Sequence, residues 1–293
     1  MKKIQHRIEY IALIVFAACL RLLPLSWARF FARRLADFAY YFVPIRKKIV
    51  LKNLADSFKD EKSPSELRRI AKGTYRQFAQ TIIELIFFPK LTKEDIKNMV
   101  SIEGRDALDA ALKGGKGGVL VAAHFGNWEL IGPAVAQEYP LSFIIGQQSN
   151  ELTDDLLNSY RAMQGMRMIP MKVSLRGVTR VLKDNEFIAL VSDQDAHEKG
   201  TFVDFFGRPA STPKGPALFA LRFGAPIIAS MMIREKGHFR AVFEEVPRPA
   251  LTGDEEKDIQ NYTAAYTKVL EKYIRMYPDH WFWMHKRWKT RPS

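Results

Sequence analysis

The spacing of hydrophobic residues divides the chain into a helical first third and a longer remainder that alternates between strands and helices. Within residues 22–42, large aliphatic and aromatic side chains recur every three or four positions, with arginines between them. Residues 63–89 repeat this period after Ser63-Pro64-Ser65-Glu66, which combines a capping residue, a proline for the first turn and an acidic side chain. These patterns predict amphipathic helices in the first hundred residues.

Beyond Gly104 the pattern changes to short apolar runs separated by helical segments. The first run follows Gly117-Gly118 and is typical of a buried strand. The expected strands cover residues 119–123, 142–145, 187–191, 226–232 and 239–243. The expected helices cover residues 154–164, 175–183, 216–223 and 255–276. This alternation predicts an α/β fold, in which helices flank a central sheet that is mostly parallel or mixed.

The apolar N-terminus is expected to associate with a membrane. Tyr10 to Leu20 is almost wholly apolar, but Arg21 interrupts the run, and a helix needs about 20 continuous apolar residues to span a bilayer. Residues 10–25 therefore either span the membrane or lie at its interface. The following helix suits the interface, because its apolar face can enter the acyl boundary while its arginines meet lipid phosphates. The alternative is a core helix with a solvated basic face.

The sequence contains no internal repeat and no low-complexity linker. We therefore expect an N-terminal membrane-associated helical region at residues 1–100 and an α/β domain at residues 101–293. With 47% hydrophobic residues, the chain can bury a substantial core. Its single cysteine, Cys19, excludes an intramolecular disulfide framework and a thiolate zinc site.

The charge of the chain indicates an anionic partner. The 45 lysines and arginines exceed the 32 acidic residues, which gives a net charge of +13. Nucleic acid, anionic lipid and an acidic carrier protein all suit such a charge. Residues 1–60 hold twelve of the basic side chains and four of the acidic ones, mixed with apolar residues, and this distribution favours an anionic membrane surface.

The strongest chemical signal is the segment from His124 to Glu129, which directly follows the expected strand 119–123. Ligands of open α/β sheets bind outside the carboxyl ends of strands, so this histidine is expected to face a crevice. Gly126 and Asn127 suit a tight turn and a helix N-cap, which would let Glu129 fold back toward the imidazole. A carboxylate on one ring nitrogen fixes the tautomer and leaves the other nitrogen to take a proton from an alcohol.

Such a pair needs no serine or cysteine nucleophile, because the substrate supplies the hydroxyl. The alternative interpretation is a surface loop in which Glu129 only caps a helix. A zinc site usually needs two histidines at helical spacing, which this segment lacks, so no metal is expected.

At these residues the sequence resembles the lysophospholipid acyltransferase superfamily, whose hallmark is a histidine followed five positions later by aspartate or glutamate. It is more closely similar to the lipid A biosynthesis branch, the late lauroyl or myristoyl acyltransferases, with glutamate in place of aspartate. Further segments match that branch in order along the chain: Tyr160-Arg161 with Gly165, Asp193-Gln194-Asp195, Phe205-Phe206-Gly207-Arg208-Pro209-Ala210-Ser211-Thr212, and the run from His280 to Lys289.

The resemblance implies a glycerol-3-phosphate acyltransferase-like fold and transfer of a fatty acyl chain from acyl carrier protein or acyl-CoA. The acceptor is expected to be a hydroxyl of a lipid A precursor, a phosphorylated glycolipid. The enzyme is expected at the inner (cytoplasmic) membrane, with the catalytic domain on the cytoplasmic face and without a cofactor. His124 and Glu129 are the expected catalytic residues, and backbone donors near them are expected to stabilise the oxyanion.

Arg161, Asp193, Arg208 and Thr212 are expected to bind substrate. Arg161 matches an arginine of that branch and Asp193 follows the strand 187–191, so they either pair with each other or bind the acceptor. A structural salt bridge is the alternative for both. Arg208 and Thr212 precede a helix that begins near Lys214, which suits a phosphate or headgroup contact, although an ordinary turn is an equal alternative.

Two other interpretations stay open. One is a non-enzymatic basic membrane-binding protein. The other is a related acyltransferase that acts on a lysophospholipid or a phosphatidylinositol mannoside. The tryptophans and cations of residues 281–289 also suit base stacking, but the sequence has no RNA-binding strand motif, zinc finger or recognition-helix pattern. No nucleic-acid partner is therefore expected.

Overall fold

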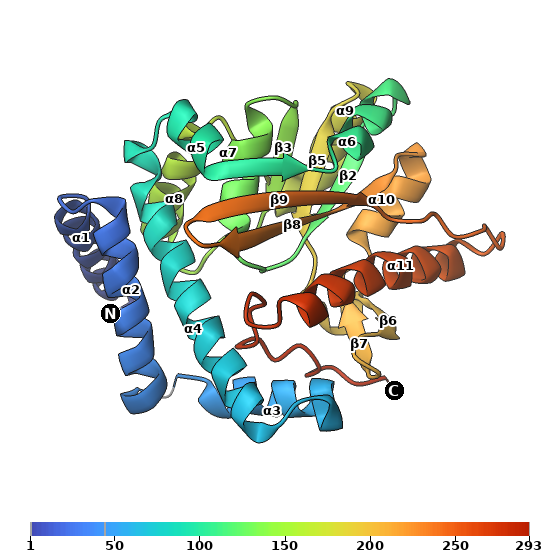
Figure 1. The fold of residues 1–293 in the computed structure, drawn as a ribbon. Coiled ribbons are helices and arrows are strands. Elements are labelled where there is room, and N and C mark those ends of the chain that lie inside the picture. Colours follow the sequence, from blue (N-terminus) through green and yellow to red (C-terminus); the bar gives the residue numbers. More distant parts are fainter. Residues whose placement is uncertain (1, 44, 293) are drawn as a thin grey trace.

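A seven-stranded sheet occupies the centre of the computed structural model, which describes residues 2–43 and 45–292 (Figure 1). The strands lie in the order β1-β9-β8-β2-β5-β3-β4. Their bounds are Val100–Glu103 (β1), Gly118–Ala122 (β2), Leu141–Ile145 (β3), Arg167–Pro170 (β4), Phe187–Val191 (β5), Ile227–Glu235 (β8) and His238–Glu245 (β9). Every neighbouring pair is parallel except β8 and β9. The predicted α/β fold with a mostly parallel sheet is confirmed.

Helices cover both faces of this sheet. One face packs against α9 (Ser174–Lys183), α10 (Gly215–Phe223) and α11 (Glu255–Met276). The other face packs against α5 (Lys93–Met99), α6 (Arg105–Lys113), α7 (Ile131–Ala136) and α8 (Glu151–Met163). Strand β2 lies between the two layers, and its residues are buried on both sides, Val119 and Val121 in one cluster and Leu120 in the other. This double burial explains why β2 is a continuous apolar run.

The predicted strands and helices of the α/β part each coincide with an observed element within a few residues, and β5 and α11 have the predicted bounds. The prediction missed the short helices α5, α6 and α7. It also missed β1, β4 and a separate hairpin of β6 (Thr201–Asp204) and β7 (Pro209–Thr212). Each missed strand has only four residues, too few to display a clear alternation.

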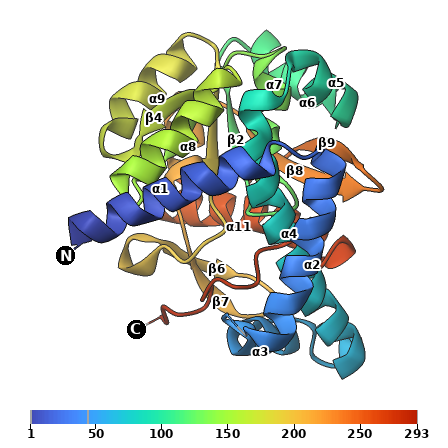
Figure 2. The same cartoon turned by 90° about the vertical axis from the view of Figure 1, so that its left-hand side faces the viewer.

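The helices ahead of the sheet are α1 (Lys2–Leu20), α2 (Leu25–Phe42), α3 (Lys47–Phe58) and α4 (Pro64–Phe87). Helix α4 begins with the predicted capping box, in which Ser63 and Glu66 each accept from the backbone N–H of the other. Helix α2 packs along α4, and α1 packs on α8 (Figure 2). Short 3-10 helices are η1 (Lys59–Glu61), η2 (Phe88–Lys90), η3 (Trp128–Leu130), η4 (Met171–Val173) and η5 (His197–Lys199).

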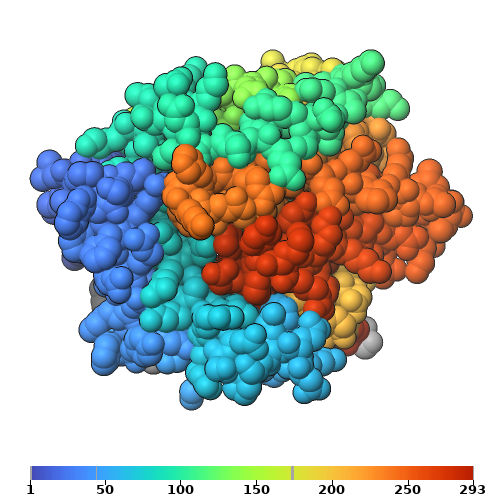
Figure 3. Space-filling view, in the orientation of Figure 1, coloured from blue at the N-terminus to red at the C-terminus, as the bar shows by residue number. Residues whose placement is uncertain are grey.

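Helices α1 and α2 bury small residues and expose large ones. Ala17, Ala28 and Ala32 pack against the end of α4. The exposed apolar side chains include Ile4, Ile8, Ile11 and Val15 of α1 and Trp27, Phe31, Leu35, Phe38 and Phe42 of α2. Both helices lie at one side of the molecule, coloured blue in Figure 3. Among the described residues, none of the helices has the length and apolar character needed to cross a membrane.

Candidate active site

Strand β2 leads to His124 at the carboxyl edge of the sheet. The turn that follows requires the predicted glycine, because Gly126 has a φ of +57° and a Cβ there would lie 1.7 Å from the carbonyl oxygen of Met232. Asn127 then caps η3, since its Oδ1 accepts a 3.2 Å hydrogen bond from the backbone N–H of Leu130. The predicted turn and N-cap are confirmed.

Asp193 holds the imidazole of His124. Strands β2 and β5 are parallel neighbours, with Ala122 opposite Val191, so the residues that follow both strands meet at the same edge. Nδ1 of His124 lies 2.8 Å from Oδ1 of Asp193. Oδ2 of Asp193 accepts from the backbone N–H of His124 at 3.0 Å and from the indole N–H of Trp281 at 2.7 Å. This buried carboxylate is therefore fixed by three donors.

The hydrogen bond determines the protonation of the ring. Because Asp193 accepts from Nδ1, the neutral imidazole carries its proton there and keeps a lone pair on Nε2. Burial disfavours the charged imidazole, but the charge of Asp193 and its hydrogen bond outweigh burial and raise the pKa of His124 above its ordinary value of 6.5, with a smaller contribution from Glu129. Burial would raise the pKa of Asp193, but the charge of His124 and the hydrogen bonds to the carboxylate outweigh it and lower that pKa.

Glu129 binds Arg161 and not His124. Its carboxylate accepts two hydrogen bonds of 2.8 Å from Nε and Nη2 of Arg161, which lies on α8. Oδ1 of Asn158 accepts a third from Nη1 at 2.6 Å. The predicted bond between Glu129 and the imidazole is therefore wrong. The physical reason is that the bidentate guanidinium satisfies Glu129, while the neighbouring strand provides a carboxylate within reach of Nδ1.

Of the two alternatives for Arg161 and Asp193, a pair with each other is absent from the described contacts, because each residue has another partner. Both nevertheless lie at the same site. Arg161 lines the cavity beside Glu129, and Asp193 lies behind His124. Sequence reasoning thus gathered four residues that the structure brings together, but it assigned the wrong carboxylate to the imidazole.

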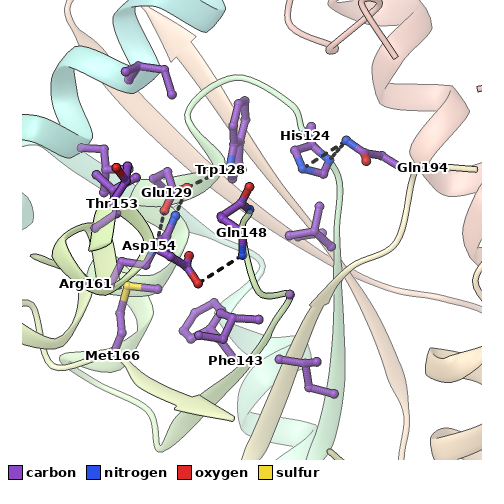
Figure 4. A pocket seen from close by; sticks show the side chains of 18 of the residues that line it. His124, Trp128, Glu129, Phe143, Gln148, Thr153, Asp154, Arg161, Met166 and Gln194 are labelled. Carbon is purple, nitrogen blue, oxygen red and sulfur yellow. Dashed lines mark hydrogen bonds and ion pairs between the residues drawn. The ribbon is translucent and has the colours of Figure 1, made fainter. Parts of the chain in front are cut away.

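A cavity of about 810 Å³ opens beside His124 (Figure 4). Figure 4 shows His124 and Gln194 on one side of it and Glu129 with Arg161 on the other. Apolar side chains that line the cavity include Leu13, Phe78, Ile82, Leu85, Ile131, Phe143, Leu157, Met166 and Phe282. Small-molecule sites typically have about 300–1,000 Å³. In residues 2–43 and 45–292 there is no group of three or more histidine, cysteine or acidic side chains that could hold a metal ion.

Arg208 and Thr212 lie on the β6–β7 hairpin and do not line this cavity. Arg208 donates to Asp56 at 2.9 Å and stacks on Trp288, with its guanidinium carbon 3.5 Å from the ring centroid. Thr212 is buried and accepts from the guanidinium of Arg287. Both side chains thus pack the hairpin against α3 and the C-terminal segment. Their contact with a substrate headgroup stays a prediction, and the structure does not bring them to His124.

Sequence reasoning missed the residues beneath the turn. Glu84 of α4 is almost fully buried and accepts hydrogen bonds of 2.6 Å from Arg29, 2.6 and 2.8 Å from Arg234 and 2.5 Å from Asn127. Thr81, one turn earlier, donates to the carbonyl of Gly126 at 2.9 Å. These contacts fix the turn from below. The available signal was an acidic residue inside the apolar run of residues 82–86, because a buried charge needs partners.

Comparisons with known proteins identify the family of this chain. The model of the family described as bacterial lipid A biosynthesis acyltransferase matches residues 1–290. The lipid A biosynthesis palmitoleoyltransferase of Escherichia coli (strain K12) is 26% identical over 273 residues, which are 92% of this chain and 87% of that protein. The phosphatidylinositol mannoside acyltransferase of Mycolicibacterium smegmatis is 26% identical over 231 residues, 77% of this chain and 73% of that protein. The crystal structure of the 1-acyl-sn-glycerophosphate acyltransferase from Thermotoga maritima is 15% identical, with a TM-score of 0.36, over 83% of this chain and 98% of that one.

Proposed function

Because this chain belongs to the bacterial lipid A biosynthesis acyltransferase family, and is therefore an O-acyltransferase, we propose that it transfers a fatty acyl chain from a thioester to a hydroxyl of a lipid A precursor. One observation carries the proposal: a buried carboxylate holds Nδ1 of His124, and the imidazole lines a largely apolar cavity. This is the geometry of a general base beside a site for a hydrocarbon chain. Membership in an enzyme family argues against the non-enzymatic alternative.

In the proposed mechanism, Asp193 orients His124 and stabilises the imidazolium that forms. Nε2 of His124 takes the proton of the acceptor hydroxyl while the hydroxyl oxygen attacks the thioester carbonyl carbon. The new C–O bond forms as the carbonyl electron pair moves to oxygen. Collapse of this intermediate breaks the C–S bond, and the leaving thiolate takes the proton from Nε2. Asp193 thereby has the orienting role that the sequence had suggested for Glu129.

Glu129 and Arg161 have a separate part in this proposal. Their ion pair forms a polar patch on the cavity wall, across from His124. Three hydrogen bonds, two to Glu129 and one to Asn158, fix the guanidinium, and its two remaining N–H groups suit a polar group of a bound lipid or thioester. We assign Arg161 to substrate positioning and Glu129 to holding Arg161. The apolar residues beyond them, such as Leu157 and Met166, would contact the acyl chain.

The acceptor and the donor rest on different arguments. Membership in the family supports a lipid A precursor, whereas the similarity to the mycobacterial acyltransferase, at the same 26% identity, supports a phosphatidylinositol mannoside as the second candidate. A net charge of +13 favours anionic partners. Acyl carrier protein is acidic and the lipid A precursor is phosphorylated, so both suit this charge. The charge does not discriminate acyl carrier protein from acyl-CoA, which is also anionic.

We also propose that α1 and α2 attach the enzyme to the inner membrane, with the cavity facing the cytoplasmic leaflet. Their exposed faces combine large apolar residues with arginines such as Arg34. Leu13 of α1 lines the cavity, so the cavity adjoins this apolar surface and a lipid acceptor would have a short path from the bilayer.

The test is an acyl-transfer assay with the purified full chain in vesicles that contain a lipid A precursor. Acyl carrier protein thioesters of several chain lengths and acyl-CoA serve as donors, and mass spectrometry identifies the products. We expect one added acyl chain on the acceptor. His124→Ala should lower turnover by about 10²–10⁴-fold, because it removes the general base, while the chain remains folded. Full turnover by this variant would refute the assignment of His124, and transfer only to a phosphatidylinositol mannoside would refute the acceptor.

A further inference from the structure

The proposed reaction places negative charge on the former carbonyl oxygen, and an enzyme of this kind needs a donor for that oxyanion. The backbone of the turn was the expected source. However, the N–H of His124 donates to Asp193 at 3.0 Å, that of Phe125 to the carbonyl of Ala123 at 2.7 Å, and that of Gly126 to the carbonyl of His280 at 2.9 Å. The expectation is therefore wrong for these three residues, since their N–H groups are already used to build the turn.

Two side chains of the cavity wall that carry donors, Trp128 and Arg161, already bind other groups. The indole N–H of Trp128 donates to Oε1 of Glu129 at 3.2 Å. The guanidinium of Arg161 uses Nε and Nη2 for Glu129 and Nη1 for Asn158. The indole of Trp128 has no second N–H group. Arg161 has two N–H groups that these bonds do not use, but it lies across the cavity from His124 (Figure 4). A side-chain donor on the same side of the cavity as His124 is better placed than these two.

Gln194 occupies that place. It follows Asp193 directly, lines the cavity and lies beside the imidazole in Figure 4. Its amide nitrogen is 3.3 Å from Nδ1 and 3.4 Å from Nε2 of His124. In the plane of the ring, an atom at these distances from both nitrogens would overlap Cε1, so the amide nitrogen lies over the face of the ring. Nε2 therefore stays accessible in the ring plane for the acceptor hydroxyl.

We propose that the side-chain amide of Gln194 donates the hydrogen bond that stabilises the oxyanion of the tetrahedral intermediate, an inference that rests on the acyl transfer proposed above. The reacting carbon must approach an oxygen that is itself bonded to Nε2, so a donor beside Nε2 is within reach of the developing charge. Among the residues that the structure describes, the amide nitrogen of Gln194 has no hydrogen-bond partner other than the imidazole. It can therefore turn toward the oxyanion without losing a competing hydrogen bond.

The chain geometry links this donor to the base. Asp193 and Gln194 are consecutive residues after β5, and Asp193 is fixed by its three donors. In this short segment, the side chain of Asp193 orients His124, and the side chain of Gln194 provides the oxyanion donor. The electron pair that Gln194 stabilises is the one that returns to the carbonyl when the C–S bond breaks, so Gln194 neither gains nor loses a proton.

The test compares Gln194→Ala and Gln194→Met with the wild type in the same vesicle assay. Removing one oxyanion donor is expected to lower kcat by about 10²–10³-fold, with KM for the thioester nearly unchanged. Gln194→Met keeps the length of the side chain without the donor, so it separates lost donation from lost packing. Gln147→Ala is the matched control, because Gln147 is exposed and does not line the cavity. Thermal unfolding monitors the fold of each variant.

A second readout separates this role from a structural one. An oxyanion donor should leave the midpoint of the pH–rate profile at the wild-type value, whereas a residue that only positions His124 should move it. Retained kcat in both variants, or a loss of kcat that appears together with a displaced midpoint, would overturn the proposal for Gln194. An inactive wild type with every thioester donor would instead overturn the acyl transfer itself, and with it this inference.

Discussion

Two glutamates stand on opposite sides of the turn at residues 124–129, and each binds an arginine. On the core side, Glu84 binds Arg234, and its side chain is 1% exposed. On the cavity side, Glu129 binds Arg161, and these side chains are 10% and 17% exposed. Only the second pair lines the cavity. The same chemistry therefore holds the turn in place on one side and remains accessible to a substrate on the other.

The two pairs also differ in what depends on them. Glu84 accepts from Arg29 of α2 and Arg234 of β8, and from the capping residue Asn127. Its removal leaves two largely buried guanidinium groups without a carboxylate, which is more unfavourable than the loss of a partly exposed partner. Arg161, by contrast, retains its contact with Asn158 when Glu129 changes. We expect variants on the core side to affect folding and variants on the cavity side to affect turnover.

Of the variants that test this difference, Glu84→Ala should have the largest effect, and the effect should be on stability. We expect a loss of about 3–5 kcal/mol in the free energy of unfolding, because the buried arginines lose their partner. A urea titration monitored by tryptophan fluorescence would measure it. The control is Glu138→Ala, which removes an ion pair between exposed side chains of Arg105 and Glu138 and should cost about 0–1 kcal/mol. Equal losses in the two variants would contradict the structural role of Glu84.

Glu129→Gln should have a smaller effect, on activity more than on stability. The glutamine still accepts one hydrogen bond from Arg161 but loses the charge, and hydrogen bonds to charged groups contribute about 1.5–3 kcal/mol. We expect kcat/KM to fall by about 10–100-fold, with most of the change in KM. Steady-state kinetics with varied acceptor would measure this. A fall confined to kcat would instead return Glu129 to the role of orienting His124, against the observed geometry.

The sequence predicted the residues on the cavity side of the turn better than those on the core side. The order of the strands explains both the success and its limit. His124 and Asp193 each follow an apolar run, so both could be assigned to the carboxyl edge of the sheet. Their hydrogen bond could not be predicted, because it requires β2 and β5 to be neighbours, and β3 and β4 come between them in the chain. The nearest acid in sequence, Glu129, was therefore paired with the histidine.

The contacts on the core side were missed for a related reason. Arg234 lies 150 positions from Glu84, and Arg29 lies 55 positions away, so no local pattern joins them. A glutamate in an apolar helix signals only that some partner exists. The partners of Arg208 were missed in the same way, because its Gly- and Pro-rich surroundings gave no sign that the folded chain places Asp56 and Trp288 against it.

The smallest predicted effect concerns the pH dependence of turnover. His124 acts as a base only when Nε2 is unprotonated, so activity is lost as pH falls through its pKa. Because that pKa is raised, the midpoint of kcat/KM against pH should lie above 6.5 in the wild type. Burial lowers the pKa of His285 to about 4, so this neighbouring ring stays neutral and adds no second transition near that midpoint.

Variants of the two glutamates should also differ in the midpoint of the pH–rate profile. Burial and Asp193 have the larger and opposite effects on the pKa of His124, and the charge of Glu129 adds to the raising effect of Asp193, so Glu129→Gln should lower the midpoint. Glu84→Gln changes a charge on the core side that is not among the groups shifting this pKa, and its midpoint should match the wild type. Initial rates at subsaturating acceptor would give both values between about pH 5 and pH 9. If both variants shifted the midpoint equally, the charge of Glu84 would influence the imidazole as strongly as the charge of Glu129 does. The two sides of the turn would then not differ in their electrostatic effect on His124.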